Sequence, residues 1–565
     1  MEQAKEKLHN LLDEAWEYGL KENPIFASFI GDYRYNDQMP EISLEIFEKH
    51  YQKDKEFLSR LKEISKEDLD GEDQLNYLIF QENLESSIRE YELGSHFLPI
   101  NNVAGFHISL PQLSSQLRFS TIKDYEDYIS RLEKMGDFID GQIRVMEKGV
   151  EKGYSPAKAA LSGCQDAIES QIVTPEKSPF FLPFQNFPSS VPEKYHEELR
   201  EKAKRAIQNS VIPAYNRLLE FLKEKYLPAA REKSGISEIP QGREFYQHRI
   251  RTYTAPGLTP EKIHEIGLQE VERIKKEMEE VIHNLSFQGS FSDFLEFLRT
   301  DPQFYAETEK DLLKEVSYIL KKMDGELPRY FQRLPRIPYG IRPVPEYSAP
   351  KAPTAYYMPP AGDGSRAGFY YVNTYDLKSR PLYELETLSL HEAVPGHHLQ
   401  IALQQEMDLP PFRKYAHFLA YIEGWALYAE RLGRELGFYE DPYSFFGHLT
   451  YEIWRACRLV VDTGIHAMGW SRDQAIQFMT ENSALSRLNI ESEVDRYIAW
   501  PGQALSYKIG ELKFRELRQK AEQEMGEDFS IREFHSVLLE SGSVPLSVLE
   551  EKVNSYIQSK TKIKG

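Results

Sequence analysis

A proline and a glycine interrupt the segment of the chain in which helix-forming and metal-ligating residues coincide. Upstream leucines recur at helical spacing and predict an amphipathic helix that carries His391 and Glu392. Pro395 and Gly396 follow, although proline removes a backbone donor and glycine weakens a helix. Because the sequence tolerates both residues here, we infer that a distortion of this helix serves a function.

This distortion decides whether His391 and His397 can bind the same metal ion. In a straight helix, two residues six positions apart lie about 240° around the axis and about 9 Å along it. A bulge or loop at Pro395-Gly396 that adds two residues would place His397 where the common His-Glu-x-x-His motif has its second histidine. The sequence therefore predicts a helix that is broken between residues 390 and 400.

A third ligand is expected further along the chain, at Glu423. Apolar residues surround Glu423 at three- and four-residue offsets, so it lies on the face of a helix that should be buried. A buried carboxylate is costly unless it pairs with a cation or binds a metal, and an ordinary ion pair with an arginine is the alternative. We predict one Zn²⁺ per chain, bound by His391, His397 and Glu423 with water in the fourth position. Glu430 is the second choice of ligand, or a group that supports one.

These motifs resemble those of a known bacterial family. The pattern His-Glu-Ala-x-Pro-Gly-His-x-x-Gln, starting at His391, is followed by Glu-Gly-Trp at 423–425. The resemblance also takes in 23–32, 363–368, 458–466 and 501–508, and therefore spans nearly the whole chain. The family is catalogued as domain of unknown function 885. The resemblance implies a divergent branch of the zinc peptidases that include angiotensin-converting enzyme and the thermostable metallocarboxypeptidases.

Composition limits the partners and the compartment. The 565 residues carry a formal net charge of −20, which argues against nucleic acid and anionic membranes as partners. The two cysteines, Cys164 and Cys457, suit a reducing compartment. Neither a secretory signal nor an apolar run of about 20 residues is visible. We therefore expect a cytoplasmic protein, and both a monomer and a homodimer stay open.

Helical periodicity over most of the chain predicts a mainly α fold, in which a large multi-helical body encloses a deep active-site cleft. We expect a single domain over 1–565, with a helical cover lobe (1–335) and a catalytic lobe (336–565) as an option. Short strands at 341–347, 355–358 and 368–373 would form a small antiparallel sheet next to the zinc helix. The last strand, with Gly368 and Tyr370, is our candidate edge strand for binding a substrate backbone. A purely structural hairpin is the alternative.

Peptide hydrolysis needs a donor for the oxyanion and contacts for the substrate. Tyr497 and Tyr507 are candidate donors, and the resemblance suggests this role because a His and a Tyr at comparable spacing act in the converting-enzyme relatives. Packing tyrosines are the alternative. A substrate C-terminal carboxylate could be held by Arg458, His466, Arg496 or Lys508. If one of them does so, a carboxypeptidase or dipeptidase is predicted, and otherwise an oligopeptidase.

The predicted function is zinc-dependent cleavage of short peptides, since a closed helical cleft would exclude folded proteins. Glu392 would act as the general base, taking a proton from water and passing it to the leaving amine. His398 and Gln400 are expected to be structural or to support a ligand, and Gln400, three residues after His397, could steady its imidazole. One alternative is a zinc amidase that acts on modified or D-amino-acid peptides. Another is a non-catalytic binding protein with a structural metal, which the presence of Glu392 disfavours.

Overall fold

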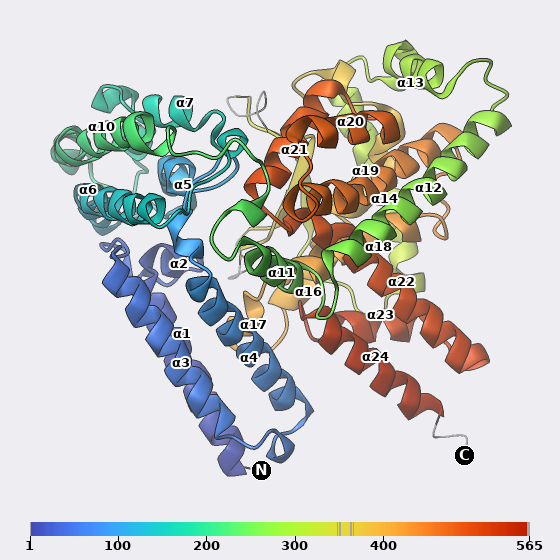
Figure 1. Cartoon of the computed structure of the whole chain (residues 1–565), viewed down its shortest axis with the longest axis horizontal. Helices are drawn as coiled ribbons and strands as arrows, with labels where there is room; N and C mark the ends of the chain where they lie inside the picture. Colours follow the sequence, from blue (N-terminus) through green and yellow to red (C-terminus); the bar gives the residue numbers. More distant parts are fainter. Residues whose placement is uncertain (1, 347–348, 350–351, 362–363, 365, 562–565) are drawn as a thin grey trace. The chain divides into compact units, whose positions relative to one another are not determined.

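The computed structural model describes residues 2–561 except 347–348, 350–351, 362–363 and 365. The fold is mainly α, as predicted, with one small sheet (Figure 1). The chain divides into two compact units. Unit 1 comprises Met1–His248, Ile465–Arg472 and Ile498–Trp500, and unit 2 comprises Arg249–Gly464, Asp473–Tyr497 and Pro501–Gly565. Tyr347 of the first predicted strand, and Asp363 and Ser365 of the resemblance, lie outside the described residues.

Unit 1 consists of helices and turns. The helices α1, α3 and α4 pack against one another (Figure 1). The helices of unit 1 are α1 (Glu2–Glu22), α2 (Pro24–Phe29), α3 (Leu44–Lys62), α4 (Gly71–Glu92), α5 (Phe106–Gln112), α6 (Ile122–Glu151), α7 (Cys164–Glu169), α8 (Leu182–Gln185), α9 (His196–Ala206), α10 (Ile212–Phe221) and the first part of α11 (Gly242–Tyr253).

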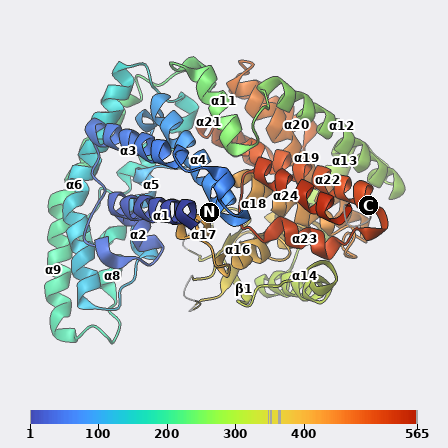
Figure 2. The ribbon, with the colours of Figure 1, turned by 90° about the horizontal axis from the view of Figure 1, so that it is seen from below.

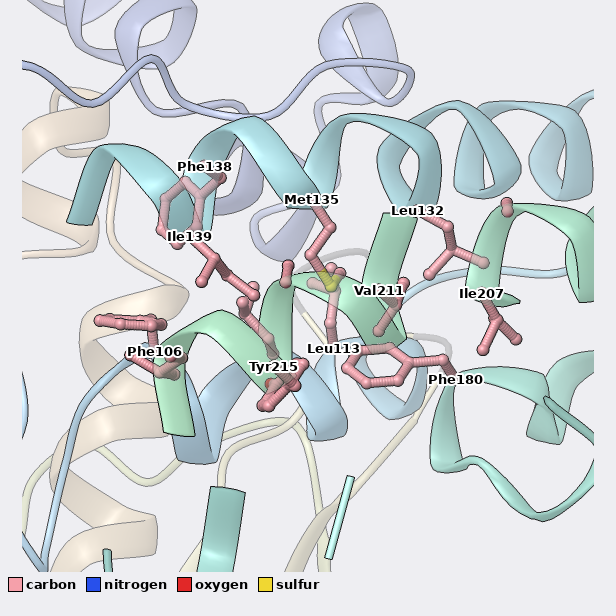
Figure 3. Close-up of a cluster of buried hydrophobic side chains, with 14 of the residues drawn as sticks. Phe106, Leu113, Leu132, Met135, Phe138, Ile139, Phe180, Ile207, Val211 and Tyr215 are labelled. Carbon is pink, nitrogen blue, oxygen red and sulfur yellow. The ribbon is translucent and has the colours of Figure 1, made fainter. Parts of the chain in front are cut away.

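The core of unit 1 forms around α6. A capping box made by Thr121 and Asp124 starts this helix. The helix packs against α9 (Figure 2) and against α10. Met135 of α6 and Tyr215 of α10 are fully buried in the apolar cluster between them (Figure 3). This cluster gives unit 1 a hydrophobic core of its own.

Unit 2 contains the residues of the predicted zinc site. In the part of the chain described, its helices are the rest of α11, α12 (Pro260–Asn284), α13 (Phe291–Thr300), α14 (Glu309–Tyr330), α15 (Leu385–Glu392), α16 (His397–Gln405), α17 (Pro411–Lys414), α18 (Leu419–Leu432), α19 (Pro442–His466) up to Gly464, α20 (Arg472–Asn482) from Asp473, α21 (Arg487–Ala499) up to Tyr497, α22 (Ser506–Met525), α23 (Ile531–Leu539) and α24 (Leu546–Thr561). No helix among the described residues is both long enough and apolar enough to span a bilayer.

The sheet of unit 2 is mixed, so the predicted purely antiparallel sheet is wrong. Its strands are β1 (Tyr339–Pro343), β2 (Ala355–Met358) and β3 (Gly368–Val372), in the order β1-β3-β2. The consecutive strands β2 and β3 pair in antiparallel fashion. The chain reaches β2 before β3, and β1 pairs with the far edge of β3 in parallel. Because both edges of β3 are hydrogen-bonded, β3 is the central strand and the prediction that it is an edge strand is also wrong.

Two glycines allow α18 and α22 to approach closely. A Cβ atom added at Gly424 of α18 would lie 2.6 Å from the Cα atom of Gly510 on α22. A Cβ atom added at Gly510 would collide with the carbonyl oxygen of Ala420. These are backbone contacts, which cannot be relieved by turning a side chain. The position of α18, which carries Glu423, therefore depends on the absence of side chains at this crossing.

We expect Gly510→Ala to lower the free energy of unfolding by about 2 kcal/mol, because the methyl group overpacks the crossing. Gly325→Ala on α14 is the matched control, since a Cβ atom there has no atom within 4 Å. Relief of the glycine penalty should stabilise this control by up to about 1 kcal/mol. Urea denaturation followed by circular dichroism measures both. Equal stability of the two variants would contradict the close packing described here.

Candidate metal centre

The helix that carries His391 is broken where the sequence predicts. The first segment, α15, ends at Glu392, and α16 begins at His397. Between them Ala393 and Gly396 leave the helical conformation, with ψ of −102° and −127°. The Gly396 amide donates to the Leu390 carbonyl at 2.9 Å, which closes the turn. The predicted interruption between 390 and 400 is confirmed.

Gly396 and Trp425 hold this turn in place. A Cβ atom on Gly396 would collide with the carbonyl oxygens of Leu390 and His391, so no side chain fits there. The indole Nε1–H of Trp425, on α18, donates to the Pro395 carbonyl at 2.8 Å. The Trp425 side chain is fully buried. This hydrogen bond joins the turn between the two histidines to the helix that carries Glu423.

The break brings His391 and His397 together and places Glu423 opposite both. The Nε2 atoms of the two histidines lie 3.6 and 3.7 Å from Oε2 of Glu423, and the ligand atoms of all three residues lie within 4.8 Å of one another. Two ligands on a tetrahedral zinc ion with bonds of about 2.1 Å are separated by about 3.4 Å. The predicted juxtaposition of the three residues is confirmed, and what they bind stays a prediction.

The charges and donors of this cluster suit a cation. Glu423 Oε2 is buried and has no hydrogen-bond partner within the described part of the chain. Burial opposes ionisation of Glu423, but His391, His397 and Arg458 lower its pKa to about 2, so it stays charged. An unpaired buried carboxylate oxygen is costly. Two imidazoles and one carboxylate form a common donor set for catalytic zinc.

Glu430 and Arg455 orient His391. Glu430 is buried, and its Oε1 atom lies 2.7 Å from Nδ1 of His391, so Nε2 is the nitrogen that faces Glu423. The Nη2 atom of Arg455 lies 3.5 Å from the same oxygen of Glu430. Of the two roles predicted for Glu430, ligand or support for a ligand, the hydrogen bond to His391 favours support. Burial lowers the pKa of His391, but Glu423 and Glu430 outweigh it and raise the pKa to about 10.

Glu392, the predicted general base, follows His391 directly at the end of α15. Burial raises its pKa to about 7, with the charges of Glu423 and Glu430 acting in the same direction and His391 opposing them. A carboxylate whose pKa lies near neutrality can both accept and release a proton at physiological pH. The electrostatic setting of Glu392 therefore suits a general base.

Gly368 and Tyr370 do not offer a free strand edge to a substrate, because they lie in the central strand β3. A Cβ atom on Gly368 would lie 2.9 Å from Nδ1 of His398, so this glycine packs against His398 on α16. Tyr370 is fully buried, and burial together with the charge of Glu392 raises its pKa. Gly368 and Tyr370 therefore pack next to the candidate metal centre, and the prediction that they bind substrate through an edge strand is wrong.

The neighbours of His397 have structural partners. Nδ1 of His398 lies 2.8 Å from the hydroxyl of Tyr357 on β2, which agrees with the structural role expected for His398. Gln400 donates to Gln404 at 2.9 Å and makes no hydrogen bond to His397. The idea that Gln400 steadies this imidazole is therefore wrong.

The two candidate tyrosines differ in what their hydroxyl groups can do. Tyr497 is buried and donates its single proton to Glu493 at 2.8 Å, so the prediction that it stabilises an oxyanion is wrong. Tyr507, on α22, is partly exposed. Its hydroxyl accepts from Arg496 at 3.4 Å and donates to no residue of the described chain. Tyr507 keeps the predicted role of a donor.

The structure excludes one of the four residues proposed to bind the substrate carboxylate. The Nζ atom of Lys508 is fully buried and pairs with Glu270, Glu452 and Glu511 at 3.0, 2.8 and 2.8 Å, which leaves no donor for a substrate. His466 belongs to unit 1, where its Nδ1 accepts from the backbone amide of Ile236 at 3.0 Å. The prediction that Lys508 binds substrate is therefore wrong, whereas substrate binding by His466 stays a prediction. Arg458 and Arg496 belong to unit 2 and stay candidates.

Two further residues were not predicted. Arg455 lies three residues before Arg458 on α19, and this helical spacing could have linked it to the site. His417 lies just before α18, and its charge acts on both His397 and Glu423. No pattern in the sequence around His417 distinguishes it from an ordinary loop histidine.

The geometry defines a mainly α protein with a candidate metal centre of the two-histidine, one-glutamate type. The chain belongs to the family described as "Bacterial protein of unknown function (DUF885)", whose model matches residues 24–553, so the predicted family membership is confirmed. No curated protein matches the chain.

Two solved structures share the fold. One is "The crystal structure of the putative lipoprotein from Colwellia psychrerythraea", with 30% identity, a TM-score of 0.93, and coverage of 99% of this chain and 100% of that chain. The other is a "putative lipoprotein of unknown function from Shewanella oneidensis", with 18% identity and a TM-score of 0.72. It covers 97% of this chain and 99% of that one.

We expect Glu430→Gln to weaken zinc binding by about 10- to 100-fold, because the neutral amide replaces the charged carboxylate that accepts a hydrogen bond from His391. Competition with a chromophoric chelator measures the affinity. Glu272→Gln is the control, since the Glu272 side chain is 71% exposed and, among the described residues, pairs only with Lys276 on the same helix. Equal affinity of both variants would show that Glu430 does not support a metal ligand.

Zinc binding at pH 8 should release at least about one proton per ion, because the ion requires a neutral imidazole. The metal-free protein carries this proton on His391, whose pKa is raised to about 10. Since the proton competes with the ion, apparent affinity should rise with pH towards pH 10. Calorimetry in buffers of different ionisation enthalpy counts the protons released. A heat of binding that does not depend on the buffer would contradict this account of His391.

Proposed function

We propose that the chain is a zinc-dependent hydrolase that cleaves peptide bonds in short peptides. The observation that carries the proposal is the convergence of His391, His397 and Glu423 around a buried carboxylate oxygen that has no hydrogen-bond partner in the described chain, with Glu392 next to His391 in the sequence. When bound, zinc supplies a Lewis acid that lowers the pKa of water and polarises a carbonyl group. The relation to zinc peptidases that the resemblance implies belongs to this proposal.

Glu392 is the proton carrier of the proposed reaction. As a carboxylate it accepts a proton from the attacking water, and as a carboxylic acid it returns that proton to the leaving nitrogen. Its pKa of about 7 suits both steps near neutral pH. A purely structural metal site has no use for such a base next to a ligand.

Tyr507 is the proposed donor to the oxyanion of the tetrahedral intermediate. Its hydroxyl oxygen accepts from Arg496, so the phenol proton stays available to a substrate. A donor that points at developing negative charge lowers the barrier of acyl transfer. Tyr497, whose proton Glu493 holds, fixes the position of the surrounding side chains instead.

The proposed substrates are short peptides, and the cytoplasmic location expected from the sequence stays a proposal. The titles of both similar structures contain the words "putative lipoprotein". A lipoprotein is attached to a membrane by a lipid, so fractionation of cells that produce the native full-length protein decides between the two locations.

The decisive experiment compares wild type with Glu392→Gln for metal content and for cleavage of a pool of short peptides. We expect both to bind about one zinc ion and the variant to lose at least about 100-fold in kcat/KM. Mass spectrometry measures both the bound metal and the products. Glu272→Gln should cleave like wild type, because its side chain is exposed and distant in sequence from the cluster.

Two outcomes would contradict the proposal in different ways. If wild type binds zinc but leaves normal peptides intact, a panel of modified and D-amino-acid amides tests the amidase alternative, and inactivity on all of them favours a binding role. If neither protein holds a metal after reconstitution, the cluster of two histidines and Glu423 is not a zinc site.

A further inference from the structure

A second polar cluster in unit 2 has more positive than negative charge. Arg458 of α19 and Arg496 of α21 share a single carboxylate, Glu493. The Nη2 atom of Arg458 lies 3.0 Å from Oε2 of Glu493, whereas the Nη1 atom of Arg496 lies 3.5 Å from Oε1. A carboxylate carries one negative charge, so one of the two guanidinium charges is not balanced within this group.

The two arginines keep hydrogen-bonding capacity that their partners do not use. Arg458 is 2% exposed, and its Nη1 atom has no hydrogen-bond partner in the described part of the chain. Its guanidinium carbon lies 4.5 and 4.4 Å from the ring centres of Trp454 and Tyr507, so the group contacts both aromatic rings. A buried cation without a full counter-charge is costly unless an anion completes it.

Arg496 gives this cluster its contact with solvent. Its side chain is 25% exposed, and its Nη2 atom donates to Gln503 at 2.9 Å and to Tyr507 at 3.4 Å. The hydroxyl of Tyr507 accepts from Arg496 and has a proton to donate. Two guanidinium groups therefore converge beside Tyr507, and a carboxylate matches this arrangement because its two oxygens accept from a guanidinium fork.

We propose that Arg496, backed by Arg458, binds the C-terminal carboxylate of the substrate, so that the enzyme is an exopeptidase acting from that end. This inference rests on the proposed peptidase function. The charge of Arg458 also lowers the pKa of the predicted zinc ligand Glu423, so the arginine cluster interacts electrostatically with the candidate metal centre. An α-carboxylate is a group that all unblocked short peptides share, whereas an acidic side chain is present only in some.

The test uses three forms of one N-blocked tripeptide with otherwise neutral side chains: the free acid, the C-terminal amide, and an amide with glutamate as last residue. Wild type should prefer the free acid over the neutral amide by about 100-fold in kcat/KM, the effect expected of charge-assisted hydrogen bonds. Arg496→Met should lose about this factor on the acid and little on the amide. Arg496→Lys, which keeps the charge without the fork, should recover part of it.

Arg487→Met is the matched control, because Arg487 lies on the same helix, is 62% exposed and has Glu491 as its only ion-pair partner in the part of the chain that the structure describes. It should behave like wild type on all three peptides. Unchanged zinc content and thermal stability of Arg496→Met exclude misfolding as the cause of a loss. The terminal-carboxylate site is overturned if wild type cleaves acid and neutral amide equally, if Arg496→Met slows both equally, or if the glutamate amide restores the full rate.

A binding measurement separates this inference from the proposed function. Glu392→Gln is titrated by calorimetry with the free acid and with the neutral amide of the same peptide. Binding of the acid alone, abolished by adding Arg496→Met, supports the carboxylate site even if wild type cleaves no peptide, in which case only the proposed activity fails. Equal binding of acid and amide overturns the site even if cleavage is observed.

Discussion

The candidate metal centre depends on one hydrogen bond, from the indole of Trp425 to the carbonyl of Pro395. A proline and a glycine end one helix segment and allow another to start, but a turn of this kind has no fixed orientation by itself. Trp425 supplies that orientation, because it follows Glu423 by two residues on the same helix. The bond therefore fixes the two histidines and the carboxylate relative to one another through the backbone.

Packing around α18 reinforces this constraint. Gly424, the residue between Glu423 and Trp425, lies against Gly510 with no room for a side chain on either helix. Three successive residues thus have three separate tasks: one is a predicted ligand, one allows close packing, and one holds the turn. This explains in physical terms why glutamate, glycine and tryptophan occur together in the sequence, since a shift of any one would disturb the other two.

The sequence was sufficient to predict the helical fold, the break after Glu392 and the convergence of His391, His397 and Glu423, because helical spacing and proline chemistry are local properties. It failed where the answer depended on partners distant in the chain. The sequence does not show that Lys508 forms ion pairs with Glu270 and Glu452. Nor does it show that Tyr497 donates its hydroxyl proton to Glu493. The parallel pairing of β1 with β3 is another such case, because strand order is not encoded in the strands alone.

A single helix connects the two halves of the site. On α19, Arg455 contacts Glu430, which orients His391, and Arg458, three residues later, contacts Glu493 and Tyr497. Residues three apart lie on neighbouring positions of one helix face, so the helix repeat sets the separation between the support of the metal centre and the arginine cluster. Both arginines also stack on Trp454, at 4.7 and 4.5 Å from its ring centre. A substrate held by the arginine cluster would therefore meet the metal centre at a distance that the rigid backbone of α19 determines, which is the condition for cleavage at a fixed position from the substrate's end.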